Sequence, residues 1–391
     1  MKKNEEKLII LENEHKVQNI IKKNNRNYGI DLVRILSMIF IINHHIIFHG
    51  GPLFKTKIFS LEHKILVFLN VICVSGVNIF GLISGCIGFH SYKFSNLFYL
   101  LFTKFLYSIN ISHLFKYFRP KLIVKFFNHL YTLFITDYWY FTAYFTIYFF
   151  FPLINEGITQ IKQKKMTHFI INLFFIFSFL NEIMKCSKRF KSVDIFNLKN
   201  GFSYSWLLIL YLFGGYLGKF KIDNTKKRNK YYYIKYIILI IIFGLIKTKL
   251  LLNEIVKTKV NYIDINYASP TYLGISISFI LIFANININN KIIVKLISFF
   301  SSLTYGIYLS HNHLFVRLYI IRKYFLWILK YKSIKIIIIE IMCSFGVFLF
   351  CSFIDLIRLY IFRFLKIKKI FILLENKINI MADKISSINF P

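Results

Sequence analysis

Four ionisable side chains interrupt the first long apolar run of this sequence, residues 29–48. Asp31, Arg34, His44 and His45 lie within or at the edge of this run, which is long enough to cross a bilayer, since crossing takes about 20 residues. An ionisable side chain inside a membrane span is costly, so it is a functional-site hypothesis by default. This run is therefore the first candidate site for chemistry.

Helical spacing groups three of these side chains on one stripe. At about 100° per residue, Asp31, Arg34 and His45 fall within roughly 60° of one another, whereas His44 points elsewhere. Arg34 and His45 are three turns apart, about 16 Å along the axis. An arginine carries a fixed fork of donors suited to phosphate or carboxylate, and a histidine exchanges a proton near neutral pH. We interpret the stripe as a catalytic group with Arg34 gripping an anion and His45 acting as a buried general base.

A purely structural interpretation of the same stripe stays open. Asp31 and Arg34 stand at positions i and i+3, where opposite charges can simply neutralise each other. His45 can then hydrogen-bond a neighbouring helix. The residues of this run do not by themselves decide between the two interpretations.

A second polar stretch covers residues 75–85. Gly81 and Gly85 form a small-xxx-small face that lets two helices approach closely. Asn78 and Ser84 add polar atoms at membrane depth. Helix packing is the favoured interpretation, and a substrate-binding lining that includes Asn78 and Ser84 is the alternative.

Aromatic residues dominate two later stretches. Trp139 stands at the start of residues 138–148, as expected of an interfacial aromatic belt, and Tyr144 follows where it could line a cavity. Tyr308 and His311 occur in a late apolar run and complete the set of candidate substrate-binding residues. His311 and His313 are not helix neighbours, so we predict no metal site there.

The absence of several motifs narrows the chemistry. The sequence contains no P-loop, no GxSxG elbow, no Cys/His zinc spacing and no HExxH. Neither an ATP-driven nor a zinc-dependent mechanism has support. We predict no bound cofactor and no metal.

Composition indicates which elements must position these side chains. The chain has 391 residues, 56% of them hydrophobic, and a mean hydropathy of +0.55, which is typical of a polytopic membrane protein. The formal charge of +34 comes from Lys and Arg scattered between apolar runs, which favours contact with anionic lipid headgroups over nucleic acid. We predict membrane lipids as partners and no nucleic acid.

The apolar runs predict an all-α bundle of about ten membrane spans. Lys and Arg in the short loops favour a cytoplasmic N-terminus, although both faces are basic. We predict a cytoplasmic tail over residues 1–28, one transmembrane domain over 29–362 and a basic amphipathic cytoplasmic tail over 363–391. The expected spans are roughly 30–49, 65–90, 94–115, 138–156, 167–184, 202–218, 231–252, 267–286, 298–321 and 334–361.

Together these segments resemble the acyltransferase 3 family of integral membrane acyltransferases, which modify bacterial surface glycans. Arg34 and His45 match its R-x10-H signature, and residues 77–85 are similar to its second-span pattern ending in Ser-Gly. Residues 139–155, 214–218 and 305–311 match three later landmarks in the same order. The resemblance extends over about residues 28–360.

The resemblance implies a cell-membrane O-acyltransferase that moves an acyl group, usually acetyl, from acyl-CoA to a sugar hydroxyl on a lipid-linked or exported glycan. By position, His45 would be its essential histidine, and Arg34 would orient it or contact the CoA phosphates. Many members carry an Arg-x-x-Arg pair near the third span, whereas residues 90–93 here read His-Ser-Tyr-Lys. Lys93 or Lys104 could substitute as point charges. A membrane or extracytoplasmic partner protein could complete the transfer.

Two other functions remain as alternatives. The first is a glycan or lipid transporter without covalent chemistry, which predicts paired Gly/Pro-broken spans in matching halves. The second is a polymerase of oligosaccharide units, which the short loops disfavour.

Overall fold

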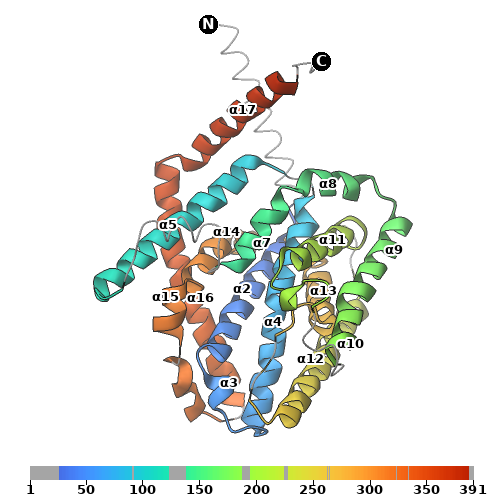
Figure 1. Cartoon of the computed structure of the whole chain (residues 1–391), viewed down its shortest axis with the longest axis vertical. Helices are drawn as coiled ribbons and strands as arrows, with labels where there is room; N and C mark the ends of the chain where they lie inside the picture. Colours follow the sequence, from blue (N-terminus) through green and yellow to red (C-terminus); the bar gives the residue numbers. More distant parts are fainter. Residues whose placement is uncertain are drawn as a thin grey trace.

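The computed structural model describes residues 26–89, 92–122, 138–186, 194–223, 228–261, 263, 265–322, 324–332 and 334–386. Within these ranges the regular structure is helical and contains no strand (Figure 1), so the all-α expectation is confirmed for this part of the chain. The longer helices are α2 (Tyr28–Phe48), α4 (Leu61–Gly88), α5 (Phe94–Phe118), α11 (Tyr204–Phe220), α12 (Lys230–Thr258), α13 (Pro270–Ala284), α14 (Lys291–His311), α16 (Ile334–Phe364) and α17 (Ile367–Ser386). The shorter ones are α3 (Pro52–Lys55), α7 (Trp139–Tyr148), α8 (Phe151–Gln160), α9 (Gln163–Leu173), η1 (Phe174–Leu180), α10 (Asn181–Cys186), η2 (Lys199–Gly201), α15 (Leu314–Val316), η3 (Arg317–Ile321) and η4 (Tyr324–Lys330).

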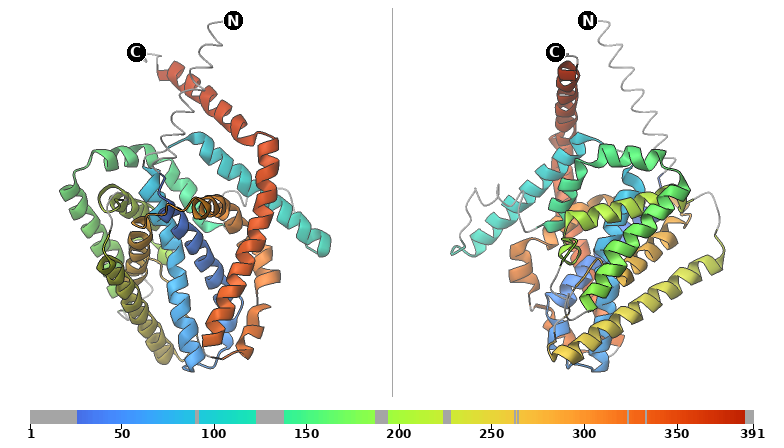
Figure 2. Two further views of the ribbon diagram at one scale, coloured as in Figure 1. Left: turned by 180° about the vertical axis from the view of Figure 1, so that it is seen from behind. Right: turned by 45° about the vertical axis from the view of Figure 1, so that its right-hand side comes forward.

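Helices α2 and α4 form the centre of the bundle (Figure 1). Helix α2 packs against α4, α13, α14 and α16, and α4 packs in addition against α11 and α12. Figure 2 shows the same central pair from behind, with α16 running along one side of it. Since α2 carries the stripe of ionisable residues, this arrangement surrounds that stripe with protein.

Glycines allow α4 and α11 to cross closely, as the small-xxx-small pattern predicts. A Cβ added at Gly85 would lie 2.0 Å from the carbonyl oxygen of Tyr211. A Cβ added at Gly214 would lie 2.1 Å from the carbonyl oxygen of Leu82. Neither position has room for a side chain, so the glycines set the distance between the two helices.

Among the described residues, five helical segments are long and apolar enough to cross a membrane, as expected of a membrane protein. They are Tyr28–Lys55, Leu61–Gly88, Gln163–Lys185, Lys291–His311 and Ile334–Phe364, and the shorter apolar helix is Pro270–Ala284. Isoleucine, leucine and phenylalanine side chains are exposed along α12 and α16, where hydrocarbon would cover them. The count of about ten spans and the cytoplasmic N-terminus stay predictions.

Two expected spans are not single continuous helices in the structure. Residues 138–156 form two short helices, α7 and α8, because Pro152 can open a helix in its first turn but cannot continue one. Residues 298–321 are helical in α14 only to His311. The His313 imidazole then accepts a hydrogen bond from the Phe315 amide and caps α15.

The predicted C-terminal tail contains helix α17, which extends away from the bundle (Figure 2). It packs on the start of α5, where Glu375 accepts a hydrogen bond from the Phe94 amide at 2.6 Å. The rings of Phe98 and Phe371 stack with centroids 6.3 Å apart. The predicted tail over residues 1–28 lies outside the described residues except for its last three.

Candidate active site

A cavity of about 490 Å³ lies beside α2 in the middle of the bundle. Its wall combines residues of α2, α4, α5, α7, α14 and η3 with residues near 200 and 265. Six of the nine residues proposed from the sequence border it: Arg34, His45, Ser84, Trp139, Tyr144 and Tyr308. The other three, Asp31, Asn78 and His311, are buried behind the wall.

His45 and His311 form a pair of imidazoles at this cavity. Their ring centroids are 5.2 Å apart. His311 donates a hydrogen bond from Nδ1 to the carbonyl of Ile307 at 2.6 Å, so its Nε2 is the acceptor nitrogen of a neutral ring. That Nε2 and the Nδ1 of His45 are both buried without a hydrogen-bond partner. The pair therefore offers unused proton-accepting capacity.

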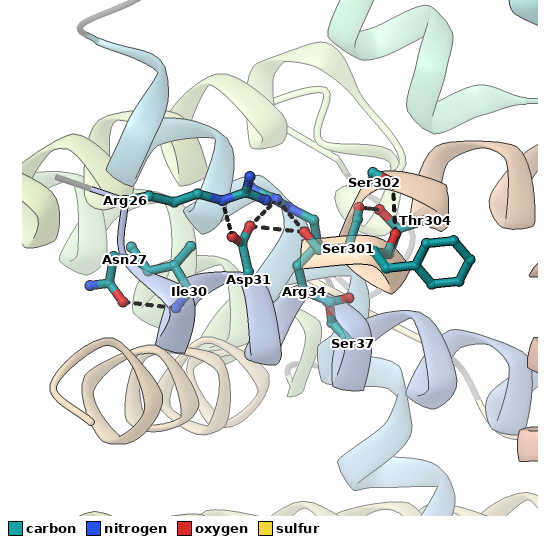
Figure 3. A network of polar contacts seen from close by, with 10 residues as sticks. Arg26, Asn27, Ile30, Asp31, Arg34, Ser37, Ser301, Ser302 and Thr304 are labelled. Carbon is teal, nitrogen blue, oxygen red and sulfur yellow. Dashed lines mark hydrogen bonds and ion pairs between the residues drawn. The ribbon is translucent and has the colours of Figure 1, made fainter. Parts of the chain in front are cut away.

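Asp31 does not border the cavity but anchors Arg34, as Figure 3 shows. Its carboxylate accepts hydrogen bonds from Arg26 Nε at 2.5 Å and from Arg34 Nη1 at 2.6 Å. Ser301 of α14 donates to the same carboxylate at 2.8 Å and accepts from Arg34 Nη1 at 2.8 Å. Two guanidinium groups thus share one buried carboxylate, and Arg34 is held with its side chain at the cavity wall.

His44 also borders the cavity, although its helical spacing places it off the Asp31–Arg34–His45 stripe. It donates a hydrogen bond from Nδ1 to Asn70 Oδ1 of α4 at 2.7 Å. This bond occupies one nitrogen of His44 and fixes its ring against α4. His44 thus turns off the stripe, toward α4, and still borders the cavity because the cavity is wider than one helical stripe.

Asn78 and Ser84 have separate roles in the structure. Asn78 accepts a hydrogen bond from Trp206 Nε1 at 3.1 Å and donates to the carbonyl of Tyr267 at 2.8 Å. Both contacts are buried and join α4 to α11 and to the loop before α13. Ser84 donates to the Phe80 carbonyl of its own helix at 3.0 Å and still borders the cavity.

Aromatic side chains form much of the cavity wall. Trp139 of α7 stacks on Tyr267 with ring centroids 5.9 Å apart, and Phe202 packs on Tyr267 at 4.8 Å. Tyr140, Tyr144 and further rings border the same space. Apolar aromatic walls with a few polar groups are typical of pockets for organic ligands.

Several bordering residues escaped the sequence analysis. Their signals are weak because they come from loops or from helices far apart in the sequence. His49 is the exception, since it stands at i+4 from His45 and its spacing alone predicts the shared face. The missed polar residues are His49, Asn200, Thr304, Asn312 and Arg317.

The two lysines considered as substitutes for the arginine pair do not border the cavity. Lys104 is buried, with its ammonium 4.6 Å from the centre of the Phe141 ring. Lys93 precedes α5, and its carbonyl accepts a hydrogen bond from Tyr148 at 2.7 Å. Among the residues that the structure describes, no group of three or more His, Cys, Asp or Glu side chains could hold a metal ion.

Comparison with known proteins gives one match. A family model described as an acyltransferase domain, that of the acyltransferase 3 family, matches residues 27–356. No curated protein and no solved structure matches the chain. The matched range contains α2, the cavity and most of α16.

Proposed function

The chain belongs to the acyltransferase 3 family, and from this premise we propose that it transfers an acyl group, in the first instance acetyl, from acyl-CoA to a hydroxyl of a cell-surface polysaccharide, oligosaccharide or glycolipid. The family supports a membrane acyltransferase. The donor, the acetyl group, the glycan acceptor and the location in the cell membrane are our proposals.

The observation that carries this proposal is the position of His45. It borders an aromatic cavity inside a membrane bundle and leaves Nδ1 without a partner. A sugar hydroxyl is a poor nucleophile until a base removes its proton, and a neutral imidazole is suited to that task.

The proposed reaction is a direct transfer. His45 accepts the proton of the acceptor hydroxyl while the oxygen attacks the thioester carbonyl. The new C–O ester bond forms, the C–S bond breaks, and the proton passes from His45 to the departing CoA thiolate. His311 acts as a positioning residue in this scheme, because its Nε2 can accept a hydrogen bond from an N–H of His45.

We assign the Arg34 end of the cavity to the donor. Arg26 and Arg34 share the single carboxylate of Asp31, so this cluster keeps a net positive charge. The guanidinium group of arginine binds phosphate strongly, and acyl-CoA carries several phosphates. Under the predicted topology, this end also faces the cytoplasm, where acyl-CoA is made.

A transporter without covalent chemistry is the alternative from another class. Transport needs no general base, so a variant that lacks the His45 imidazole would still move glycan across the membrane. The two functions therefore differ in what His45 does rather than in the shape of the cavity.

The test measures the acetyl content of surface glycans in a deletion strain complemented with wild type, with His45→Ala or with His44→Ala. We expect wild type to restore acetylation and His45→Ala to be inserted at normal levels without restoring it. His44→Ala is the matched control for local packing, and we expect it to retain more activity. Normal acetylation with His45→Ala would overturn the assignment of His45.

A further inference from the structure

Arg317 is a cation that the sequence analysis did not single out. It opens η3, it is half-buried, and it borders the cavity. No carboxylate among the described residues forms an ion pair with it, and the described residues that border the cavity include no Asp or Glu. Among the described residues, the cavity wall thus contains an arginine without a carboxylate partner.

Three other cations in the bundle show the usual arrangement. Each has a carboxylate within 3 Å: Arg34 with Asp31 at 2.6 Å, Lys247 with Glu182 at 2.9 Å and Arg358 with Asp355 at 2.7 Å. Such pairing is expected, since an isolated charge in a low-dielectric interior is costly. Arg317 departs from this pattern at a cavity wall, where an external ligand can supply the missing anion.

The position of Arg317 relates it to His45 rather than to Arg34. Arg317 borders the same cavity as His45 and His49, and η3 packs on η4, which packs on α3 just beyond His49. His49 borders the cavity one helical turn beyond His45, with ring centroids 5.3 Å apart. Arg34 lies on the other side of His45 along α2, about 16 Å away by helical rise. The base therefore stands between two cationic ends of one cavity.

We propose that Arg317, with His49 beside it, binds a negatively charged group of the acceptor, either a carboxylate on the sugar or a phosphate that links it. This inference rests on the proposed function, because it assigns the second end of the cavity to the acceptor. His49 stands one helical turn, about 5.4 Å, from His45, which is about the width of a sugar ring. The anionic group therefore lies on the acylated sugar or at its linkage. The acceptor is then an acidic glycan or a glycosyl phosphate rather than a neutral one.

The experiment compares binding of matched neutral and anionic probes to the full chain in nanodiscs of zwitterionic lipid, by calorimetry. One pair is p-nitrophenyl β-D-glucoside and p-nitrophenyl β-D-glucuronide, which tests a sugar carboxylate. The other is methyl α-D-glucoside and α-D-glucose 1-phosphate, which tests a linking phosphate. We expect the anionic member of at least one pair to bind about tenfold more tightly or better, as charge-assisted hydrogen bonds typically do.

Variants then assign the preference to a residue. Arg317→Gln should abolish the preference while leaving affinity for the neutral probe unchanged, and Arg317→Lys should retain part of it. Arg322→Gln is the matched control, because Arg322 is an exposed arginine five residues away that does not border the cavity. It should keep the full preference.

Three results would overturn the proposal. The first is equal affinity of wild type for both members of both pairs, and the second is a preference that survives in Arg317→Gln. The third is a loss of CoA affinity in Arg317→Gln with no change for the glycosides, which would place the donor at this end. None of these results depends on acetyl transfer, so failure here is distinct from failure of the His45 test.

Discussion

The imidazole rings of His45 and His311 lie 5.2 Å apart between their centroids, although they come from the first and a late membrane span. His311 is oriented by its own helix through the Ile307 carbonyl. His45 reaches the cavity, and His311 lies behind it. This arrangement makes His311 the group best placed to hold the proposed base in position.

The first prediction separates positioning from catalysis. Replacing His311 with leucine removes the acceptor nitrogen, so we expect kcat for acyl transfer to fall about tenfold or more with little change in KM for either substrate. His311→Gln keeps an acceptor atom on a side chain of similar size, and we expect it to recover part of the loss. Steady-state kinetics on purified protein make the comparison. Equal kcat in wild type and His311→Leu would contradict the role.

The second prediction concerns the Asp31 cluster. Asp31→Asn weakens the charge-assisted bonds to Arg26, Arg34 and Ser301 and frees Arg34 from its fixed position. We expect KM for acyl-CoA to rise several-fold, and Arg34→Gln to raise it about tenfold or more because the guanidinium itself is lost. Ser301→Ala removes only one neutral donor and serves as the mild control. An unchanged KM in Arg34→Gln would remove Arg34 from the donor site.

A third prediction tests the crossing of α4 and α11. Gly214→Ala places a Cβ where only 2.1 Å separates it from the Leu82 carbonyl, so the helices must move apart. Overpacking of this kind costs about 1–3 kcal/mol, and we expect a lower melting temperature in detergent. Gly346→Ala in α16 is the matched control, since nothing lies within 4 Å of its added Cβ. A melting temperature as high for Gly214→Ala as for Gly346→Ala would argue against the close crossing.

The fourth prediction concerns a buried ion pair within α16, which a hydrogen bond from Tyr107 links to α5. Asp355 accepts two hydrogen bonds from Arg358, at 2.7 and 2.8 Å, and one from Tyr107 at 2.7 Å. Asp355→Asn leaves Arg358 without its counter-charge, and breaking a buried pair typically costs about 3–5 kcal/mol. The double variant Asp355→Asn with Arg358→Gln removes both charges, so we expect it to be more stable than the single variant. Thermal unfolding of wild type, Asp355→Asn, Arg358→Gln and the double variant gives the coupling energy of the pair. Additive effects of the two single changes would refute the coupling.

The Gly214 and Asp355 variants also serve the functional tests. Both residues lie away from the cavity wall, so loss of stability there marks a folding defect. A His45 variant that keeps the melting temperature of wild type but transfers no acyl group has therefore lost the chemical step and not its fold. This contrast separates chemistry from folding.

Much about this protein could be predicted from residue order alone. Long apolar runs require helices in a bilayer, because the backbone has no water to bond there, and the costly charges at Arg34 and His45 marked the site. Gly81 and Gly85 predicted a close crossing, since only small residues permit one. Local spacing was sufficient for these conclusions because each depends on the residue types and the spacing within a single helix.

The tertiary structure decided what lies opposite each helix. Spacing along α2 could not show that Asp31 turns to Ser301 and away from the cavity, or that His44 borders the cavity as well. Nor could it bring His311 and Arg317 to His45, because contacts between distant spans depend on how helices pack, and helix packing is not periodic in the sequence. The sequence determined which residues were costly to bury, and the fold determined which of them were left unpaired.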